Sequence, residues 1–517
     1  MEENHKESLK DKVEGFINKR AKVILLIILI GAFLIRLKYL TVNAAVWWDE
    51  ADYLSLAKHF GLGLPDQSAP WRARPIPFLW SPIYYLGGTE IVIRFINLLV
   101  SVAGVYLAYV LGKEFFDTKV ALFSALFMAV YHEGIFWTAR IGLDTYAVIM
   151  WGLITIWFYR GYIQNKSKKY LYATGAIYGF GVYAYDSIGF FAVLAFLYII
   201  VTERLNFLKN KKFWCIVIGA VIAFTPLAIY SKMTFDAVYP RITNMIGAQV
   251  VADEGTREFD RPLSQNLNEY FSFFAAFPYY LKGPIFIFFI FGLLLFYEVI
   301  IGFDIMMKNK DGSENLKKDY YVLLGAFVLP FMFGFVVMVS NFYYEARYLL
   351  PAMPIYLAIA GKGLFKVQDY IAKHSYLLSW ALVIVVIVMS INSQLTFADM
   401  LIQSKKDTYA QEKFGGEWLK QMTNPGDILV GCGQSIQILY YSERKLIRNE
   451  DVALLEKSIR ENKPKFYVLD FWDPSCANIR YPFDNQDKMK LVNAYFYDQA
   501  QQQPIYLIFA INQSAYA

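Results

Sequence analysis

The chain has 517 residues, of which 57% are hydrophobic and 18% aromatic, and its formal net charge is +6. A soluble domain is usually about 45–50% apolar, so this composition argues against a single soluble globule and indicates many buried spans. The basic residues are spread over short loops, where membrane topology explains them, and no nucleic-acid partner is expected.

A basic tail, residues 1–22, precedes the first apolar run at 23–35. This run has no small-residue cleavage site and continues into polar sequence, so we expect a retained membrane anchor and not a cleaved signal peptide. Lysine and arginine gather on the cytoplasmic side of membrane proteins. The N-terminal tail is therefore predicted to be cytoplasmic.

Apolar runs long enough to cross a bilayer recur until 377–391. We expect about eleven spans within residues 23–395, at roughly 20 residues each. Lysine-rich loops alternate with lysine-poor ones, and an odd number of crossings from a cytoplasmic start places the C-terminal region outside. The predicted fold is a polytopic α-helical protein of the plasma membrane. The expected spans are centred near residues 32, 100, 129, 153, 179, 194, 221, 292, 330, 357 and 386.

Three segments are then expected on the outer side of the membrane: the loops 41–90 and 231–283, and the tail 396–517. The first loop contains "EADYLSLAKHF", which predicts a short helix lying at the interface. Both loops are candidates for a catalytic site, because they lie where several spans end.

The tail differs in character from the rest of the chain. "YAQEKFGGEWLKQM" and "EDVALLEKSIREN" predict helices, whereas "GDILVG", "KFYVLDF" and "PIYLIFAI" predict strands. Helices that alternate with short apolar strands imply a small extracytoplasmic α/β domain. Cys432 and Cys476 both lie in it, and an oxidising compartment would allow them to pair, which the sequence alone does not decide.

Carboxylates and arginines from separate segments are predicted to gather on the outer membrane face. Placing a charged side chain beside lipid costs free energy, so we expect such a cluster either to contact water or to have a function. The set, with one lysine and one tyrosine, is Arg36, Asp49, Glu50, Asp52, Tyr53, Arg72, Arg74, Arg94, Arg140, Asp144, Lys232, Arg241, Glu345 and Arg347.

These side chains suit transfer from a phosphate-bearing lipid onto a hydroxyl or an amine. A carboxylate acts as base toward the incoming nucleophile, and arginines hold a phosphate and stabilise the charge that grows on it. Nucleotide sugars are not reliably supplied outside the membrane, so a lipid-phosphate donor is the natural partner at this depth.

A plainer interpretation is open for several of these residues. An acidic pair after a transmembrane helix is more often an ordinary solvated loop, and Arg347 alone is also explained as an interfacial anchor. Asp144 is harder to explain in this way, because it begins an apolar run where a carboxylate needs a partner. Three carboxylates are enough to hold a divalent ion, but their spacing matches no metal motif, so we expect neither a metal nor another cofactor.

The N-terminal motifs resemble those of the GT-C membrane glycosyltransferases, in the branch of the protein O-mannosyltransferases and the lipid A aminoarabinose transferases. The basic tail is followed by a span ending in "FLIRL" and then by "WWDEADY" at 47–53. "WTARIGLDTY" is similar to the second acidic turn of that branch, and "EARYLLPAMP" to its late Arg-x-x-x-Pro-x-x-Pro segment. The resemblance covers about residues 1–200 and 340–365.

By this resemblance, Asp49 is the catalytic base, Glu50 orients the base or the acceptor, and Asp144 lies near the sugar. Tyr53 would contact the donor phosphate. The aminoarabinose transferases carry a lysine where this chain has Ser81 and an arginine where it has Asp52, so their specific substrate does not carry over. The donor phosphate then needs other cations, for which the candidates are Arg72, Arg74, Arg140, Arg241 and Arg347.

The sequence thus predicts an inverting glycosyltransferase. It would move a sugar from a polyprenyl-phosphate donor to a protein, lipid or glycan acceptor at the outer membrane face. The main alternative is a transporter or flippase of a lipid-linked or small polar substrate, which Asp186 within an apolar stretch favours. Transporters show paired halves and polar residues near mid-membrane, whereas the ionisable residues here gather at one face. A non-catalytic scaffold is a further alternative, and alanine at Asp49 would leave its role intact.

Overall fold

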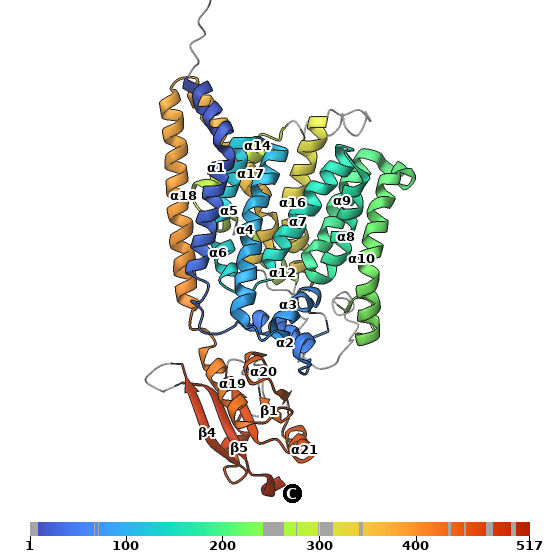
Figure 1. The fold of residues 1–517 in the computed structure, drawn as a ribbon, viewed down its shortest axis with the longest axis vertical. Coiled ribbons are helices and arrows are strands. Elements are labelled where there is room, and N and C mark those ends of the chain that lie inside the picture. Colours follow the sequence, from blue (N-terminus) through green and yellow to red (C-terminus); the bar gives the residue numbers. More distant parts are fainter. Residues whose placement is uncertain are drawn as a thin grey trace, which may run out of the picture. The chain divides into compact units, whose positions relative to one another are not determined.

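The chain forms two compact units. Unit 1 consists of Met1–Leu40 and Phe95–Ile402, and unit 2 consists of Thr41–Arg94 and Gln403–Ala517. Unit 1 is helical, whereas unit 2 combines helices with a sheet (Figure 1). The computed structural model describes residues 9–516 apart from 67, 71, 241–262, 276, 298, 300–313, 341–344, 433–435, 449–450, 472–478 and 498–502.

The helices of unit 1 run side by side and many of them are nearly parallel (Figure 1). A single π-helical turn, Tyr159–Ile163, follows α7, and a 3₁₀ helix, Ala346–Ala352, precedes α17. The helices are α1 (Leu9–Lys38), α4 (Glu90–Phe115), α5 (Thr118–Val130), α6 (His132–Thr138), α7 (Asp144–Phe158), α8 (Lys168–Ala184), α9 (Phe190–Glu203), α10 (Lys211–Phe235), α12 (Leu263–Ala275), α13 (Phe277–Leu281), α14 (Pro284–Leu294), α16 (Glu314–Ser340), α17 (Met353–Ala372) and α18 (Tyr376–Lys405).

Five helical segments among the described residues are long and apolar enough to cross a membrane. A sixth is obtained if α5 and α6, which are bent by 49° at Tyr131, form one broken span. The prediction of a multi-pass helical protein is consistent with this finding, and the number of about eleven spans stays a prediction. The five segments are Glu90–Phe115, Ser187–Lys209, Lys211–Phe235, Arg347–Ala372 and Tyr376–Lys405.

Small residues bring α8 and α10 into close contact. A β-carbon added at Gly179 would lie 2.3 Å from the carbonyl oxygen of Ala220, and one added at Gly219 would lie 2.2 Å from that of Tyr172. Helix backbones in membranes approach each other most closely where such small residues face the partner helix. Any larger side chain at Gly179 would therefore push the two helices apart.

Arg36 has a structural position in unit 1. It is 1% exposed, and its guanidinium donates to the Ser101 hydroxyl at 2.8 Å and to the Ala129 carbonyl at 2.7 Å. These bonds tie the end of α1 to α4 and to the end of α5. Arg36 is a member of the predicted outer-face set, and its guanidinium hydrogen-bonds neighbouring helices inside unit 1.

The sheet of unit 2 has five strands in the order β2-β1-β3-β5-β4. β1 pairs in parallel with β2 and with β3, whereas β5 is antiparallel to both β3 and β4. Parallel neighbours need a crossover connection, which helices supply here. The strands are β1 (Ile428–Cys432), β2 (Lys445–Arg448), β3 (Phe466–Asp470), β4 (Met489–Phe496) and β5 (Pro504–Ile511), and the helices are α19 (Ala410–Met422), α20 (Ile436–Ser442), α21 (Val452–Asn462) and α22 (Tyr481–Asp484).

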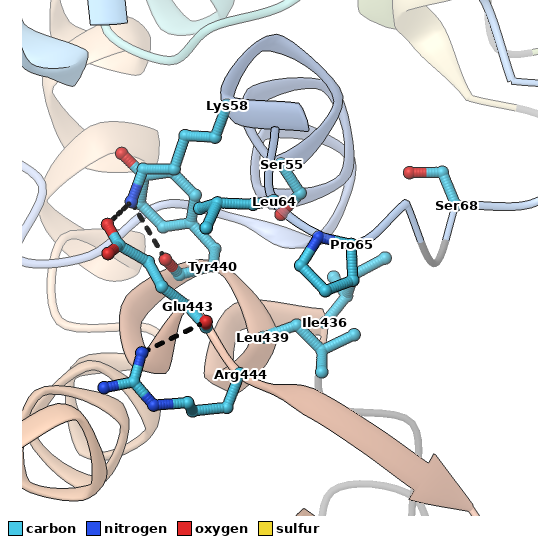
Figure 2. Close-up of a pocket in the computed structure, with 10 residues that line it drawn as sticks. All are labelled: Ser55, Lys58, Leu64, Pro65, Ser68, Ile436, Leu439, Tyr440, Glu443 and Arg444. Carbon is cyan, nitrogen blue, oxygen red and sulfur yellow. Dashed lines mark hydrogen bonds and ion pairs between the residues drawn. The ribbon is translucent and has the colours of Figure 1, made fainter. Parts of the chain in front are cut away.

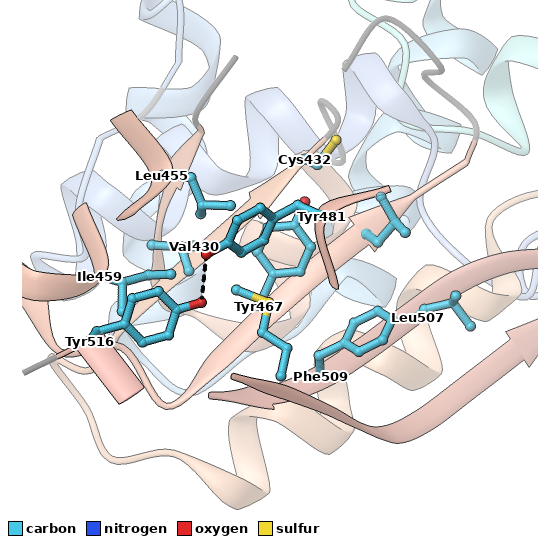
Figure 3. Packing of buried hydrophobic residues seen from close by; sticks show 11 residues of the cluster. Val430, Cys432, Leu455, Ile459, Tyr467, Tyr481, Leu507, Phe509 and Tyr516 are labelled. Atoms are coloured by element: carbon cyan, nitrogen blue, oxygen red, sulfur yellow. Dashed lines mark hydrogen bonds between the residues drawn. The ribbon is translucent and has the colours of Figure 1, made fainter. Parts of the chain in front are cut away.

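The predicted α/β character of the tail is confirmed. The two predicted helices correspond to α19 and α21, and the three predicted strands to β1, β3 and β5. Alternate strand residues such as Val430, Tyr467 and Phe509 pack with Leu455 of α21 into one buried core (Figure 3).

Cys432 at the end of β1 belongs to that core and is disulfide-bonded. Cys215 is a buried free thiol, and Cys476 lies outside the described residues.

Two helices from the predicted outer loop 41–90 belong to unit 2. They are α2 (Trp48–Leu62) and α3 (Pro75–Tyr85), which pack against each other. α2 also packs against α20 of the tail. The short interfacial helix predicted at 50–60 is thus confirmed as a helix, and its supporting surface includes a segment almost 400 residues away in the sequence.

Candidate active site

The acidic motif lies in the first two turns of α2 and faces two directions. Successive residues of an α-helix are rotated by about 100°, so Asp49, Asp52 and Tyr53 share one face, whereas Glu50 lies on another. The side chains of Asp49 and Asp52 are 28% and 2% exposed, respectively. Asp49 is therefore the carboxylate of this face that solvent and a ligand reach.

Arg72 joins the two carboxylates of this face. Its Nη1 lies 2.9 Å from Oδ1 of Asp49, and its Nε forms an ion pair with Asp52. The guanidinium carbon also lies 5.8 Å from the centre of the Tyr53 ring, within cation–π range. We name Asp49, Asp52, Tyr53 and Arg72 the α2 cluster.

Burial and charge act in opposite directions within the α2 cluster. Burial raises the pKa of Asp52, although the positive charge of Arg72 opposes the shift. For Arg72, burial alone would lower the pKa, but the charges of Asp52 and Asp49 outweigh it and the net shift is upward. Arg72 therefore stays positively charged and holds the Asp49 carboxylate in place.

Glu50 has structural partners on its own face of α2. One of its oxygens accepts the Trp47 amide at 3.1 Å and lies 3.6 Å from the guanidinium of Arg94. Glu50 and Arg94 are 2% and 3% exposed. The pair fixes the start of α2, and the sequence-based role for Glu50, to orient the base or the acceptor, stays a prediction.

Arg74 lies at the start of α3 and pairs with Asp66 at 2.5 Å. It is 7% exposed. This ion pair closes the loop between α2 and α3, from which Arg72 also comes.

Asp144 and Arg347 belong to a second cluster, in unit 1. Asp144 begins α7, is 2% exposed and accepts a hydrogen bond from the Tyr185 hydroxyl. Arg347 pairs with Glu345 at 2.7 Å, and its guanidinium lies 4.6 Å from the Trp137 ring centre. The Trp137 indole in turn donates to Glu133 at 2.8 Å. We name these residues the α7 cluster.

Arg140 and Arg241 complete the predicted set. Arg140 is 1% exposed in the turn between α6 and α7, and its guanidinium lies 4.9 Å from the Phe136 ring centre. Its carbonyl accepts from Asn97 at 2.8 Å, which fixes the turn that leads to Asp144. Arg241 lies outside the described residues.

Two acidic groups were not singled out from the sequence. Glu133 in α6 is 7% exposed and lies within electrostatic range of Asp144 and Arg347. The signal was available, because "YHEG" places an ionisable pair inside an apolar run. Glu443, which pairs with Lys58 of α2 at 2.8 Å, gave no such signal, since it lies in a polar stretch of the tail.

The described part of the chain contains no group of three or more His, Cys, Asp or Glu side chains arranged to hold a metal ion. The carboxylates of α2 are joined by a guanidinium instead. The arrangement suits proton abstraction by Asp49 beside a fixed positive charge.

Part of the chain matches a known protein family. Residues 75–230 match the family model described as dolichyl-phosphate-mannose-protein mannosyltransferase. No curated protein sequence is significantly similar to the chain.

Solved structures show where this fold occurs. ArnT from Cupriavidus metallidurans bound to undecaprenyl phosphate superposes with a TM-score of 0.64 at 12% identity, over 93% of this chain and 97% of that chain. The archaeal oligosaccharyltransferase AglB from Archaeoglobus fulgidus, in complex with an inhibitory peptide and a dolichol-phosphate, gives 0.55 at 14% identity, over 96% and 74%. The predicted resemblance to the GT-C membrane glycosyltransferases is confirmed, and the chain is an integral multi-pass membrane protein with an ArnT-like fold.

Proposed function

We propose that this protein transfers a sugar from a polyprenyl-phosphate donor to an acceptor at the outer face of the membrane. The observation that carries the proposal is the α2 cluster: a partly exposed carboxylate, Asp49, is held by Arg72 beside a second, buried carboxylate. A family match over residues 75–230 and a fold shared with ArnT support the same reaction class.

Asp49 acts as the general base in this proposal. It takes the proton from an acceptor hydroxyl or amine as the acceptor atom attacks the anomeric carbon of the sugar. The bond between that carbon and the phosphate oxygen breaks, and polyprenyl phosphate leaves with the electron pair. A single displacement of this kind inverts the anomeric centre.

The remaining predicted residues serve the donor and the geometry. Tyr53 and the arginines stabilise the charge that grows on the leaving phosphate, and Arg347 is the arginine of the α7 cluster. Asp144, fixed by Tyr185, contacts the sugar. Arg72, Arg74, Arg140 and Arg241 stay candidates for the phosphate.

The test compares purified wild type with Asp49→Asn, using a panel of radiolabelled polyprenyl-phosphate sugars and measuring transfer or hydrolysis. We expect the variant to lose activity by roughly 10²–10⁴-fold while it still binds the donor. Turnover that survives in Asp49→Asn would reject Asp49 as base but not the class of reaction. Wild type that binds no donor in the panel would reject the class.

A transporter of a lipid-linked or small polar substrate is the second candidate. It is favoured by the 49° break between α5 and α6, because broken helices with buried polar groups form the binding sites of many transporters. His132 and Glu133 lie at that break and are 0% and 7% exposed. Movement of an intact labelled donor across proteoliposome membranes, without cleavage, would select this function over sugar transfer.

A further inference from the structure

The face of α2 opposite the catalytic carboxylate is bound by the C-terminal domain. Glu50, Leu54 and Lys58 follow one another at four-residue spacing and are turned roughly 100–180° from Asp49. All three are buried. We name these three residues the rear face of α2.

Lys58 makes the main polar contacts of the rear face. Its ammonium group donates to Oε1 of Glu443 at 2.8 Å and to the Tyr440 carbonyl at 3.0 Å (Figure 2). It also lies 4.0 Å from the centre of the Tyr440 ring. Burial lowers the pKa of Lys58, and the charge of Glu443 opposes this shift. A buried ammonium is retained here only because three groups of one short segment receive it.

The same segment binds the chain on both sides of α2 and α3. The Tyr441 hydroxyl accepts the Val46 amide at 2.8 Å, just before the helix begins. The Tyr440 hydroxyl is bonded to Tyr84 at 2.9 Å and to Glu90 at 3.1 Å. Residues 440–443 therefore fix the start of α2, its rear face and the end of α3 together.

Glu443 has a backbone conformation that a glutamate rarely adopts. Its φ is 56°, in the left-handed region, at the position after α20 where helices most often have glycine. Its amide donates to the Leu439 carbonyl at 3.0 Å, and its carboxylate holds Lys58 and Lys420. Strained backbone of this kind concentrates where function requires a particular side chain. A glycine would relieve the strain but could not bind Lys58.

We propose that Lys58 and Glu443 are positioning residues for the transfer reaction, and that the C-terminal domain sets the place of the catalytic carboxylate through them. The inference rests on the proposed function of Asp49. A rigid α2 keeps the base at the distance from the acceptor that proton transfer needs, and a misplacement by about 1 Å reduces a rate by roughly 100-fold. The domain thus acts in the chemical step without touching the substrate.

The test uses three substitutions in the full-length protein: Lys58→Met, Glu443→Gln and Glu443→Gly. The control is Lys465→Met, which removes another lysine of unit 2 that pairs with a carboxylate, Asp427, at 2.9 Å. For each variant, kcat and KM are measured with the polyprenyl-phosphate sugar that wild type consumes. Unfolding midpoints and the amide exchange of residues 46–60 are measured on the same samples.

We expect kcat to fall roughly 10- to 100-fold in all three variants, with the KM for the donor unchanged and exchange in 46–60 faster. Lys58→Met separates position from stability, because it removes the buried charge while Glu443 keeps Lys420 as its partner, so it should unfold little earlier than wild type while it still loses kcat. Lys465→Met should match wild type in every readout.

Two results would overturn the inference. Wild-type kcat in Glu443→Gly and Lys58→Met, from an active wild type, rejects positioning and leaves the proposed function intact. If wild type itself consumes no donor, the proposed function fails, and the exchange data then decide whether the Lys58–Glu443 contact holds α2 at all. Unchanged exchange rejects the contact as well.

Discussion

Among single residues, a substitution at Arg72 distinguishes two roles for an arginine in such a site: positioning the base and binding the donor phosphate. It contacts both Asp49 and Asp52, so its first effect is on the position of the base. Lysine retains the charge but lacks the planar group that contacts two carboxylates at once. We expect Arg72→Lys to lower kcat roughly 10- to 100-fold with little change in the KM for the donor. Steady-state kinetics check this, with the exposed Arg460→Lys as control. A raised KM with unchanged kcat would instead assign Arg72 to the donor phosphate.

Glu412 predicts a pH dependence of stability in the C-terminal domain. It is 1% exposed in α19, and neither carboxyl oxygen has a hydrogen-bond partner among the described residues. Burial, with the charge of Asp470, raises its pKa to about 8, and the nearby Tyr506 supplies no opposite charge. The folded protein therefore binds this proton more tightly than the unfolded chain.

The sign of the effect follows from this difference in proton binding. Between about pH 4.5 and pH 8 the folded state holds more protons, so stability falls as the pH rises, by at most about 1.4 kcal/mol per pH unit. We expect Glu412→Gln to remove this dependence and the exposed Glu461→Gln to retain it. Denaturant midpoints of the full-length protein at pH 5.5 and 8 check the prediction. Equal slopes in wild type and Glu412→Gln would contradict it.

Single residues differ in how far the sequence reveals their roles. Asp49 and Arg72 lie 23 positions apart and were both singled out, because charge beside a membrane span is conspicuous. The partner of Lys58 is 385 positions away in a polar stretch, where a glutamate is ordinary. Charge and hydropathy patterns do not pair residues at that separation, so this contact required the structure.

At the level of helices, the contact between α8 and α10 predicts a sharp difference between two glycines. A β-carbon at Gly179 would clash with the backbone of α10, whereas one at Gly31 of α1 meets nothing within 4 Å. We expect Gly179→Ala to destabilise the protein by about 1–3 kcal/mol, as overpacking does. Gly31→Ala should be neutral or slightly stabilising, because alanine favours the helix. Unfolding in detergent micelles measures both, and equal effects would show that the helices tolerate separation.

The long helices and the well-patterned strands were predictable, and the short elements were not. β5, with eight residues of nearly continuous apolar sequence, was recognised at its observed bounds. β2 has four residues, "KLIR", and α20 has seven, which is too few for a strand or helix period to stand out. β4 carries lysine and asparagine, and its exposed and half-buried residues follow one another in runs, so its alternation is weak.

At the scale of the whole molecule, the sequence suggested a linear order of membrane part, outer loop and tail. The structure instead groups the loop 41–94 with the tail 403–517 as one compact unit. The reason is physical: the rear face of α2 is buried and carries Glu50 and Lys58, and buried charges need partners, which Arg94 and Glu443 provide. Sequence patterns show that a face must be buried but not which distant segment buries it.

The topology of the two chain ends gives the last prediction. Basic residues in the first tail favour a cytoplasmic N-terminus, and the disulfide at Cys432 favours an oxidising, extracytoplasmic location for the C-terminal domain. Cysteines introduced singly as Lys12→Cys and Lys457→Cys test both ends, since the Lys457 side chain is 64% exposed. In intact cells, a membrane-impermeant maleimide should label Lys457→Cys at once and Lys12→Cys only after permeabilisation. Labelling of both without permeabilisation would contradict an odd number of crossings, and the reverse pattern would place the α2 cluster on the cytoplasmic side, where nucleotide sugars are available.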